Sequence, residues 1–217
     1  MTSGPNPTLR RPNFAAGAAL ILLLVALASG VPARAADTYN IDPNHSNMGF
    51  TIRHLFSKVP GHFTKFEGSI VYDAADITKS TVNVSIDSAS IDTNAADRDK
   101  HLRSSDFFDA EKFPKITFAS NKVKSVAANK LQVEGTLTIK GVAKPVTLDV
   151  DVLGMGPDAW GGYRSGFEAH TKVNRMDYGV SWNKALEGGG TLLGEDVEIV
   201  LNVEAVKPKP AEPPAKK

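Results

Sequence analysis

Apolar and polar residues alternate one by one along most of the chain. In the first such stretch, Met48, Phe50 and Ile52 are separated by single small or polar residues. Alternation with a period of two and one apolar face is typical of antiparallel strands that are packed on one side. We therefore expect about eight strands of this kind, within residues 48–53, 66–72, 82–87, 116–118, 131–139, 146–152, 163–173 and 197–203.

Glycine- and proline-containing segments separate several of these stretches, at residues 140–145, 154–162 and 187–191. They are expected to be turns. No strand–helix–strand rhythm runs along the chain, which argues against a doubly wound parallel sheet. The sequence thus predicts an all-β fold. Eight antiparallel strands can close into a barrel whose interior holds side chains or one small ligand, but a two-sheet sandwich gives the same pattern, so periodicity leaves both open.

The segment DRDKHLRSSDFF, residues 97–108, breaks the alternation. Arg98 and Leu102 stand at helical spacing, and Thr93 or Asn94 can cap the start of a helix. We expect a short helix inserted between strands. Its charged face would meet water and its apolar residues would face the interior.

The first 35 residues have the layout of a secretory signal peptide. Arg10 and Arg11 precede an apolar run over residues 14–28, and a small-x-small site ends at Ala35. The run is shorter than the roughly 20 residues of a membrane span. The arginine pair hints at twin-arginine export, but Pro12 departs from that pattern, so general secretion is favoured. We expect cleavage after Ala35, a periplasmic location and no stable membrane anchor after cleavage.

The remaining chain is expected to form one domain over residues 36–206, followed by a disordered Pro/Lys-rich tail over residues 207–217. There is no cysteine, which excludes a disulfide framework and a thiolate metal site. Without the three arginines of the first 35 residues and the tail's four lysines and one glutamate, the body carries 18 basic and 23 acidic residues, a net charge of −5. A nucleic-acid-binding protein would show the opposite sign, so no nucleic-acid partner is expected.

The usual catalytic and metal motifs do not occur in the sequence. The five histidines are His45, His54, His62, His101 and His170. None forms an H-E-x-x-H pair, and the sequence has no G-x-S-x-G elbow. His54 is in phase with Phe50 and is therefore expected in the apolar wall. No metal site, no catalytic residue and no cofactor are predicted.

Five segments of the chain together resemble the YceI-like family of periplasmic, lipocalin-type polyisoprenoid-binding proteins. They are YNIDPNHSNMGFTIRHL, VPGHFTKFEGSI, SIDTNAADRDKHLRSSDFFDAEKFPKITFAS, VEGTLTIKGVAKPVTLDV and VNRMDYGVSW. The resemblance covers about residues 38–206. It implies an eight-stranded antiparallel lipocalin-like barrel with a helix against it, and an apolar tunnel that holds a polyprenyl chain such as a prenyl diphosphate or a quinone tail. It also implies frequent homodimers, links to stress responses, and no catalytic residues.

The resemblance also implies a set of ligand-binding residues. The expected apolar pocket comprises Phe50, His54, Phe63, Phe66, Leu102, Phe107, Phe108 and Phe118. The expected contacts to a polar head are His45, Arg98, His101 and Arg175. For Arg98 and Arg175, structural salt bridges with Asp99 or Asp177 are an equally weighted alternative.

Three functions follow for comparison. The first is periplasmic binding or transport of a long-chain isoprenoid lipid, which would be the bound ligand and the principal partner. The second is a lipid-acting enzyme with His45 or His101 as general base, which lacks a positioned nucleophile. The third is an adaptor, without a ligand, for a membrane redox partner. We favour the first and expect no enzymatic activity.

Overall fold

The computed structural model describes residues 1, 2, 4 and 36–209. Most of the predicted signal peptide and residues 210–217 of the predicted tail lie outside the described residues. The elements are, in chain order, β1 (Asp37–Ile41), β2 (Asn47–His54), β3 (Ser57–Phe63), β4 (Phe66–Tyr72), η1 (Ile77–Lys79), β5 (Thr81–Asp87), η2 (Ser88–Ser90), β6 (Ile91–Asp92), α1 (Ala96–Arg103), β7 (Lys115–Ala127), β8 (Lys130–Ile139), β9 (Val142–Pro157), β10 (Tyr163–Asn174), η3 (Arg175–Tyr178) and β11 (Leu193–Val206).

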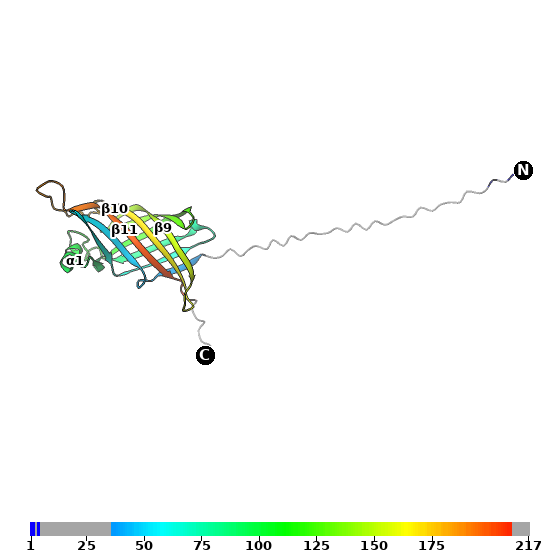
Figure 1. Cartoon of the computed structure of the whole chain (residues 1–217), viewed down its shortest axis with the longest axis horizontal. Helices are drawn as coiled ribbons and strands as arrows, with labels where there is room; N and C mark the ends of the chain where they lie inside the picture. Colours follow the sequence, from blue (N-terminus) through cyan, green and yellow to red (C-terminus); the bar gives the residue numbers. More distant parts are fainter. Residues whose placement is uncertain (3, 5–35, 210–217) are drawn as a thin grey trace, which may run out of the picture. The chain divides into compact units, whose positions relative to one another are not determined.

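The strands form one antiparallel sheet that closes on itself. Strands β1, β4, β5, β7, β8, β9, β10 and β11 pair in that order, and β11 pairs back with β1. Figure 1 shows β9, β10 and β11 side by side in one wall. The described part of the chain is therefore a closed eight-stranded antiparallel barrel with one short α-helix. This confirms the expected barrel and excludes the two-sheet sandwich.

Three further strands lengthen this barrel toward the end that carries α1. Both β1 and β2 pair with β11, β3 pairs with β2, and β6 pairs with β3. Each of the pairs β1/β2, β3/β4 and β5/β6 is thus one strand of the barrel, interrupted by a short irregular stretch. The breaks remain hydrogen-bonded, because Asp42 N–H donates to the Glu204 carbonyl and Thr64 N–H to the Ser90 carbonyl.

Strand β3 was not among the predicted strands. It contains Pro60 and Gly61, residue types that are depleted in strands. On one side β3 pairs with β2 along its whole length, whereas on the other it pairs with β6 only at His62 and Phe63. Pro60 therefore lies where one side of the strand has no partner strand, which is the edge position that tolerates proline.

The helix begins later than predicted and is not capped as predicted. Its N-cap position is Ala95, whose side chain makes no capping hydrogen bond. Asn94 has a left-handed backbone, with φ at 60°. Thr93 instead donates from both its N–H (2.9 Å) and its hydroxyl (2.5 Å) to the buried carboxylate of Asp99. The first turn is therefore held by a side chain inside the helix rather than by a residue in front of it.

The barrel begins with β1 at Asp37 and ends with β11 at Val206. Strand β11 ends at Val206, and the next residue, Lys207, is still attached, because its N–H donates to the Tyr163 carbonyl at 2.9 Å and its Nζ lies 2.5 Å from Asp37. Within the residues that the structure describes, no helix is long and apolar enough to cross a membrane.

Candidate functional site

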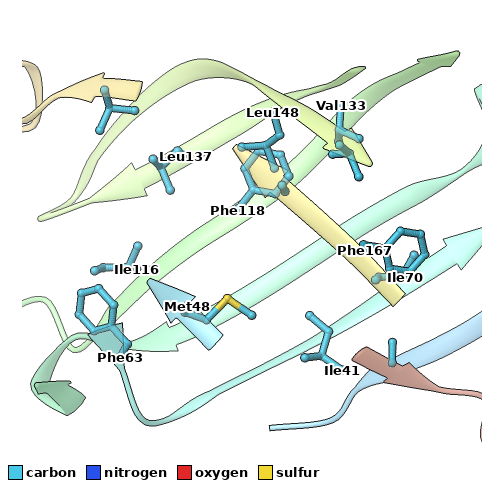
Figure 2. Close-up of a cluster of buried hydrophobic side chains, with 14 of the residues drawn as sticks. Ile41, Met48, Phe63, Ile70, Ile116, Phe118, Val133, Leu137, Leu148 and Phe167 are labelled. Atoms are coloured by element: carbon cyan, nitrogen blue, oxygen red, sulfur yellow. The ribbon is translucent and has the colours of Figure 1, made fainter. Parts of the chain in front are cut away.

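The barrel encloses a cavity of about 610 Å³. Its lining comes from nearly all strands and is mainly aliphatic and aromatic. Phe63, Phe118 and Phe167, from three different strands, point into this shared interior (Figure 2). The volume lies within the range of roughly 300–1,000 Å³ that is usual for ligand pockets. The barrel interior is therefore a candidate ligand site rather than a filled core.

Two glycines help to keep the centre of the barrel open. At Gly61, a Cβ atom would lie 2.4 Å from the ring of Phe50, and at Gly135 it would lie 2.5 Å from the ring of Phe118. Both rings line the cavity. Because the glycines have no side chain, each ring lies close against the neighbouring strand instead of extending across the lumen.

The charged groups of the lining lie at one end of the cavity. Val123, Leu131 and Phe167 line it as fully buried residues near the β7–β8 end. Arg98 and Arg175 line it at the opposite end, where α1 and η3 lie. A long apolar interior with a few polar groups at one end is suited to a molecule that is apolar along most of its length.

Arg175 is the most deeply buried charged group of this end, with 5 % of its surface exposed. Its Nε donates to the Gly194 carbonyl at 2.9 Å, and its Nη1 donates to the carbonyls of Val180 (2.5 Å) and Trp182 (2.9 Å). Its Nη2 has no hydrogen-bond partner among the described residues. Burial lowers the pKa of the guanidinium from its ordinary value, and the charge of Glu195 opposes this.

Three rings meet beside this group. His101 lies edge-on to both Phe107 and Trp182, with ring centroids 5.0 Å apart in each pair, and Phe107 and Trp182 are 5.3 Å apart. The Nε2 of His101 lies 2.8 Å from the Asp106 carboxylate. The rings join α1 to the segment after η3, so the polar end of the cavity is a fixed arrangement of aromatic and charged groups.

The salt bridges considered for the two arginines are not formed among the described residues. Arg98 donates from Nε to the Thr93 hydroxyl (2.7 Å) and from Nη2 to the Thr93 carbonyl (2.6 Å). Arg175 binds backbone carbonyls, as described above. Both side chains are therefore held without an acidic partner such as Asp99 or Asp177.

Most of the predicted site residues meet in the cavity. Those that line it are Phe50, His54, Phe63, Leu102, Phe107, Phe108, Phe118, Arg98, His101 and Arg175. Phe66 does not line it; it is half-buried and packs against the core. His45 is also absent from the lining and lies in the connection between β1 and β2.

His45 belongs to a separate cluster of ionic groups. Its Nδ1 lies 2.8 Å from the Asp42 carboxylate and 4.0 Å from that of Glu204, an arrangement that could present three ligands to a metal ion. However, Arg164 contacts the same oxygens of Asp42 and Glu204 and also binds Asp158. Because a cation already occupies these carboxylates, the cluster is better described as an ion-pair network.

Trp182 and Tyr178 are two of the lining residues that were not predicted as ligand-binding residues. Both follow Arg175 within the segment VNRMDYGVSW, which is one of the five segments that resemble the YceI-like family. Their aromatic character and their position close after Arg175 in the same segment could have identified Trp182 and Tyr178 as candidates.

A closed antiparallel barrel with a hollow, mainly apolar interior and one polar end belongs to the lipocalin-like class, whose lumen can hold a small ligand. Comparison with known protein families is more specific. Residues 39–205 match the family described as the YceI-like domain, and the chain belongs to this family, which confirms the resemblance seen in the sequence motifs.

Individual relatives agree with this assignment. The chain is 44% identical to a UPF0312 protein of Serratia proteamaculans, over 84% of this chain and 93% of the relative. It is 40% identical to Protein YceI of Salmonella arizonae, over 89% and 97% of the two chains.

Solved structures share the fold. Burkholderia cenocepacia BcnA matches with a TM-score of 0.68 and 25% identity, over 76% of this chain and 98% of that chain. The Campylobacter jejuni YCEI protein matches with a TM-score of 0.62 and 31% identity, over 72% and 90%. A polyisoprenoid binding domain from Saccharophagus degradans has a TM-score of 0.56 and 16% identity, over 78% and 98%, and is similar in fold.

Proposed function

We propose that this protein binds a long-chain polyisoprenoid lipid, of the prenyl diphosphate or isoprenoid quinone type, inside the barrel. The observation that carries the proposal is the 610 Å³ apolar cavity with the unpartnered Nη2 of Arg175 at its polar end. The fold neighbour from Saccharophagus degradans is described as polyisoprenoid binding, which supports this class of ligand.

The energetics favour an enclosed site for such a ligand. Burying a few hundred Å² of apolar chain contributes on the order of 10 kcal/mol at about 25 cal/mol per Å². Association itself costs roughly 4–15 kcal/mol. Useful affinity therefore requires that most of the chain be buried, which a barrel lumen provides and a surface groove does not. In the proposal Phe118 contacts the chain deep in the barrel, while the residues nearer the polar end that contact it are Phe50, His54, Phe63, Leu102, Phe107 and Phe108.

The head group of the lipid is proposed to lie at Arg175. A buried donor without a partner costs about 1–3 kcal/mol, and a ligand oxygen within hydrogen-bonding distance of Nη2 would remove that cost. The rings of His101, Phe107 and Trp182 would surround the head, and Arg98 lies in the same lining. His45 has no part in this proposal, because it lies in the Arg164 network outside the cavity.

A binding role is favoured over catalysis. His101, the candidate base in the cavity, is packed edge-on against the apolar rings of Phe107 and Trp182, and the sequence offers no motif for a nucleophile to accompany it. His45, the other candidate, lies outside the cavity. We propose that the protein carries its lipid unchanged, in the periplasm after export, and that a bound lipid is its ligand rather than a cofactor. His101→Ala and His45→Ala should leave a bound lipid chemically unaltered, as wild type does.

Native mass spectrometry of the protein purified from its own host tests the proposal directly. We expect a bound species whose mass, after release and fragmentation, shows repeated isoprene losses. Delipidated protein should bind the same lipid again. A protein that is free of lipid and binds none on reconstitution would overturn the proposal.

A further inference from the structure

The turn between β2 and β3 exposes an aromatic side chain completely. Phe56 is 102 % exposed. The turn itself is held in place: Leu55 N–H donates to the Leu192 carbonyl at 2.9 Å, and Arg53 Nη1 donates to the Leu55 carbonyl at 3.0 Å. Leu55 has a left-handed backbone, with φ at 49°, a conformation that is uncommon for a residue of this kind. The fold thus fixes a turn that presents Phe56 to the outside.

The exposed ring stands beside the open end of the cavity. His54 and Val59, on the two strands that flank the turn, line the cavity, as do Leu192 and Leu193 in the segment bonded to the turn. All four are only partly buried, and Asp97 and Arg98 of α1, which line the same end of the cavity, are exposed, so the cavity opens at this end. The apolar lining of the cavity therefore continues to within two or three residues of Phe56.

The size and charge of this tip indicate what it contacts. One aromatic ring buries about 150–250 Å², far less than the roughly 1,200–2,000 Å² of a stable interface between proteins. Aromatic side chains of this size do anchor proteins at membrane–water interfaces. The charge beside the turn does not favour an oppositely charged partner, because Lys58 is already paired with Glu198 at 2.8 Å.

We propose that the β2–β3 turn docks the open end of the cavity on a lipid bilayer, with Phe56 inserted among the lipids. The isoprenoid then passes between bilayer and lumen without crossing water. This inference rests on the proposed function, since it assumes that the cavity holds a membrane lipid. One inserted ring gives a weak and reversible contact, which is suited to a protein that must leave the membrane with its ligand.

The two tryptophans of the chain provide the means to test it. Trp182 lines the cavity, whereas Trp160, in the β9–β10 turn at the other end of the barrel, is 80 % exposed. Trp160→Ser leaves Trp182 as the single tryptophan and also removes an exposed ring far from the open end. Energy transfer from Trp182 to dansyl-labelled decaprenyl phosphate then reports loading, either from phosphatidylethanolamine/phosphatidylglycerol vesicles or from detergent solution.

We expect Trp160→Ser and wild type to take up the lipid from vesicles at the same rate. Co-sedimentation with vesicles compares the two proteins. Adding Phe56→Ser should slow loading from vesicles by about tenfold or more, while binding from detergent stays unchanged. Equal loading rates with and without Phe56 would overturn the docking proposal and leave the proposed function standing. A change in sedimentation behaviour with Phe56→Ser would assign the ring to a contact between copies of the chain and would also overturn it. Failure of every variant to take the lipid from detergent would overturn both proposals.

Discussion

The ring of Phe118 lies directly over Gly135, so closely that a Cβ atom at Gly135 would come within 2.5 Å of the ring and 2.6 Å of the Ala119 carbonyl oxygen. Gly135→Ala must therefore displace either backbone or ring. We expect a loss of about 1–3 kcal/mol in the free energy of unfolding, measured by urea denaturation. Gly156→Ala is the matched control, because a Cβ atom there has no neighbour within 4 Å. Equal stabilities of the two variants would show that the ring can move at no cost.

Filling the lumen should abolish lipid binding without unfolding the barrel. Ala169 is buried and lines the cavity, whereas His170, the next residue of β10, is exposed on the outer face. In a filled core, Ala169→Phe would cost about 1–3 kcal/mol by overpacking. In a hollow barrel the ring occupies free space, so we expect little change in stability and a loss of lipid binding, measured by native mass spectrometry. His170→Phe, the control, should bind lipid normally.

Arg175 should determine the preference for a lipid with a polar head. Wild type is expected to bind decaprenyl phosphate about tenfold or more tightly than the head-free hydrocarbon squalene, because a hydrogen bond to a charged group contributes about 1.5–3 kcal/mol. Arg175→Met should lose this preference while still binding squalene. Competition binding on delipidated protein measures the ratio.

Arg175→Met is also expected to be less stable than wild type, because three carbonyl groups lose their donor. The ratio of the two affinities separates this effect from head-group recognition, since lower stability weakens binding of both lipids alike. An unchanged ratio would place the head elsewhere in the cavity.

The Arg164 network should make stability sensitive to acid. The hydrogen bond from His45, and then that from Arg164, hold the pKa of Asp42 below its ordinary value of 3.8, while desolvation opposes them. A carboxyl group whose pKa is lowered by folding contributes its full stabilisation above its unfolded pKa and loses it as the pH falls through the folded pKa. We therefore expect Asp42→Asn to be less stable than wild type at pH 7.

The same variant should show a flatter decline in the free energy of unfolding below a pH of about 3.8, because the titrating group is gone. Urea denaturation over a pH series measures both curves. Parallel curves for Asp42→Asn and wild type in that range would show that the network does not couple folding to this carboxyl group.

The barrel could be predicted from the sequence because each strand has one solvent-exposed face and one face toward the apolar interior. This produces the alternation of residue types seen at Met48, Phe50 and Ile52. The same rule predicts His54 on the apolar face, and in the structure His54 lines the cavity. Strand β3 was not predicted because proline and glycine, at Pro60 and Gly61, are rare in strands. Pro60 is tolerated because β3 has no partner strand on one side at this position, and the local sequence does not show this.

The polar end of the cavity was harder to predict in detail. His101 and Trp182 lie on segments far apart in the chain, and only closure of the barrel brings their rings together. His45 carried the same motif signal as Arg175, yet it lies in the Arg164 network. Sequence indicates which polar residues are candidates, but the three-dimensional pairing decides which of them face the lumen.

Strand β11 pairs with both β1 and β2, and these pairings determine when the barrel can close during folding. The barrel closes where β11 meets β1 and β2, so that Lys207 contacts Asp37 across 170 positions of sequence. A chain that emerges with its N-terminus first, from a ribosome or from an export channel, lacks its closing strand until almost all of it has emerged. Such long-range closure slows folding. The barrel therefore cannot close around a ligand before β11 is available to pair with β1 and β2.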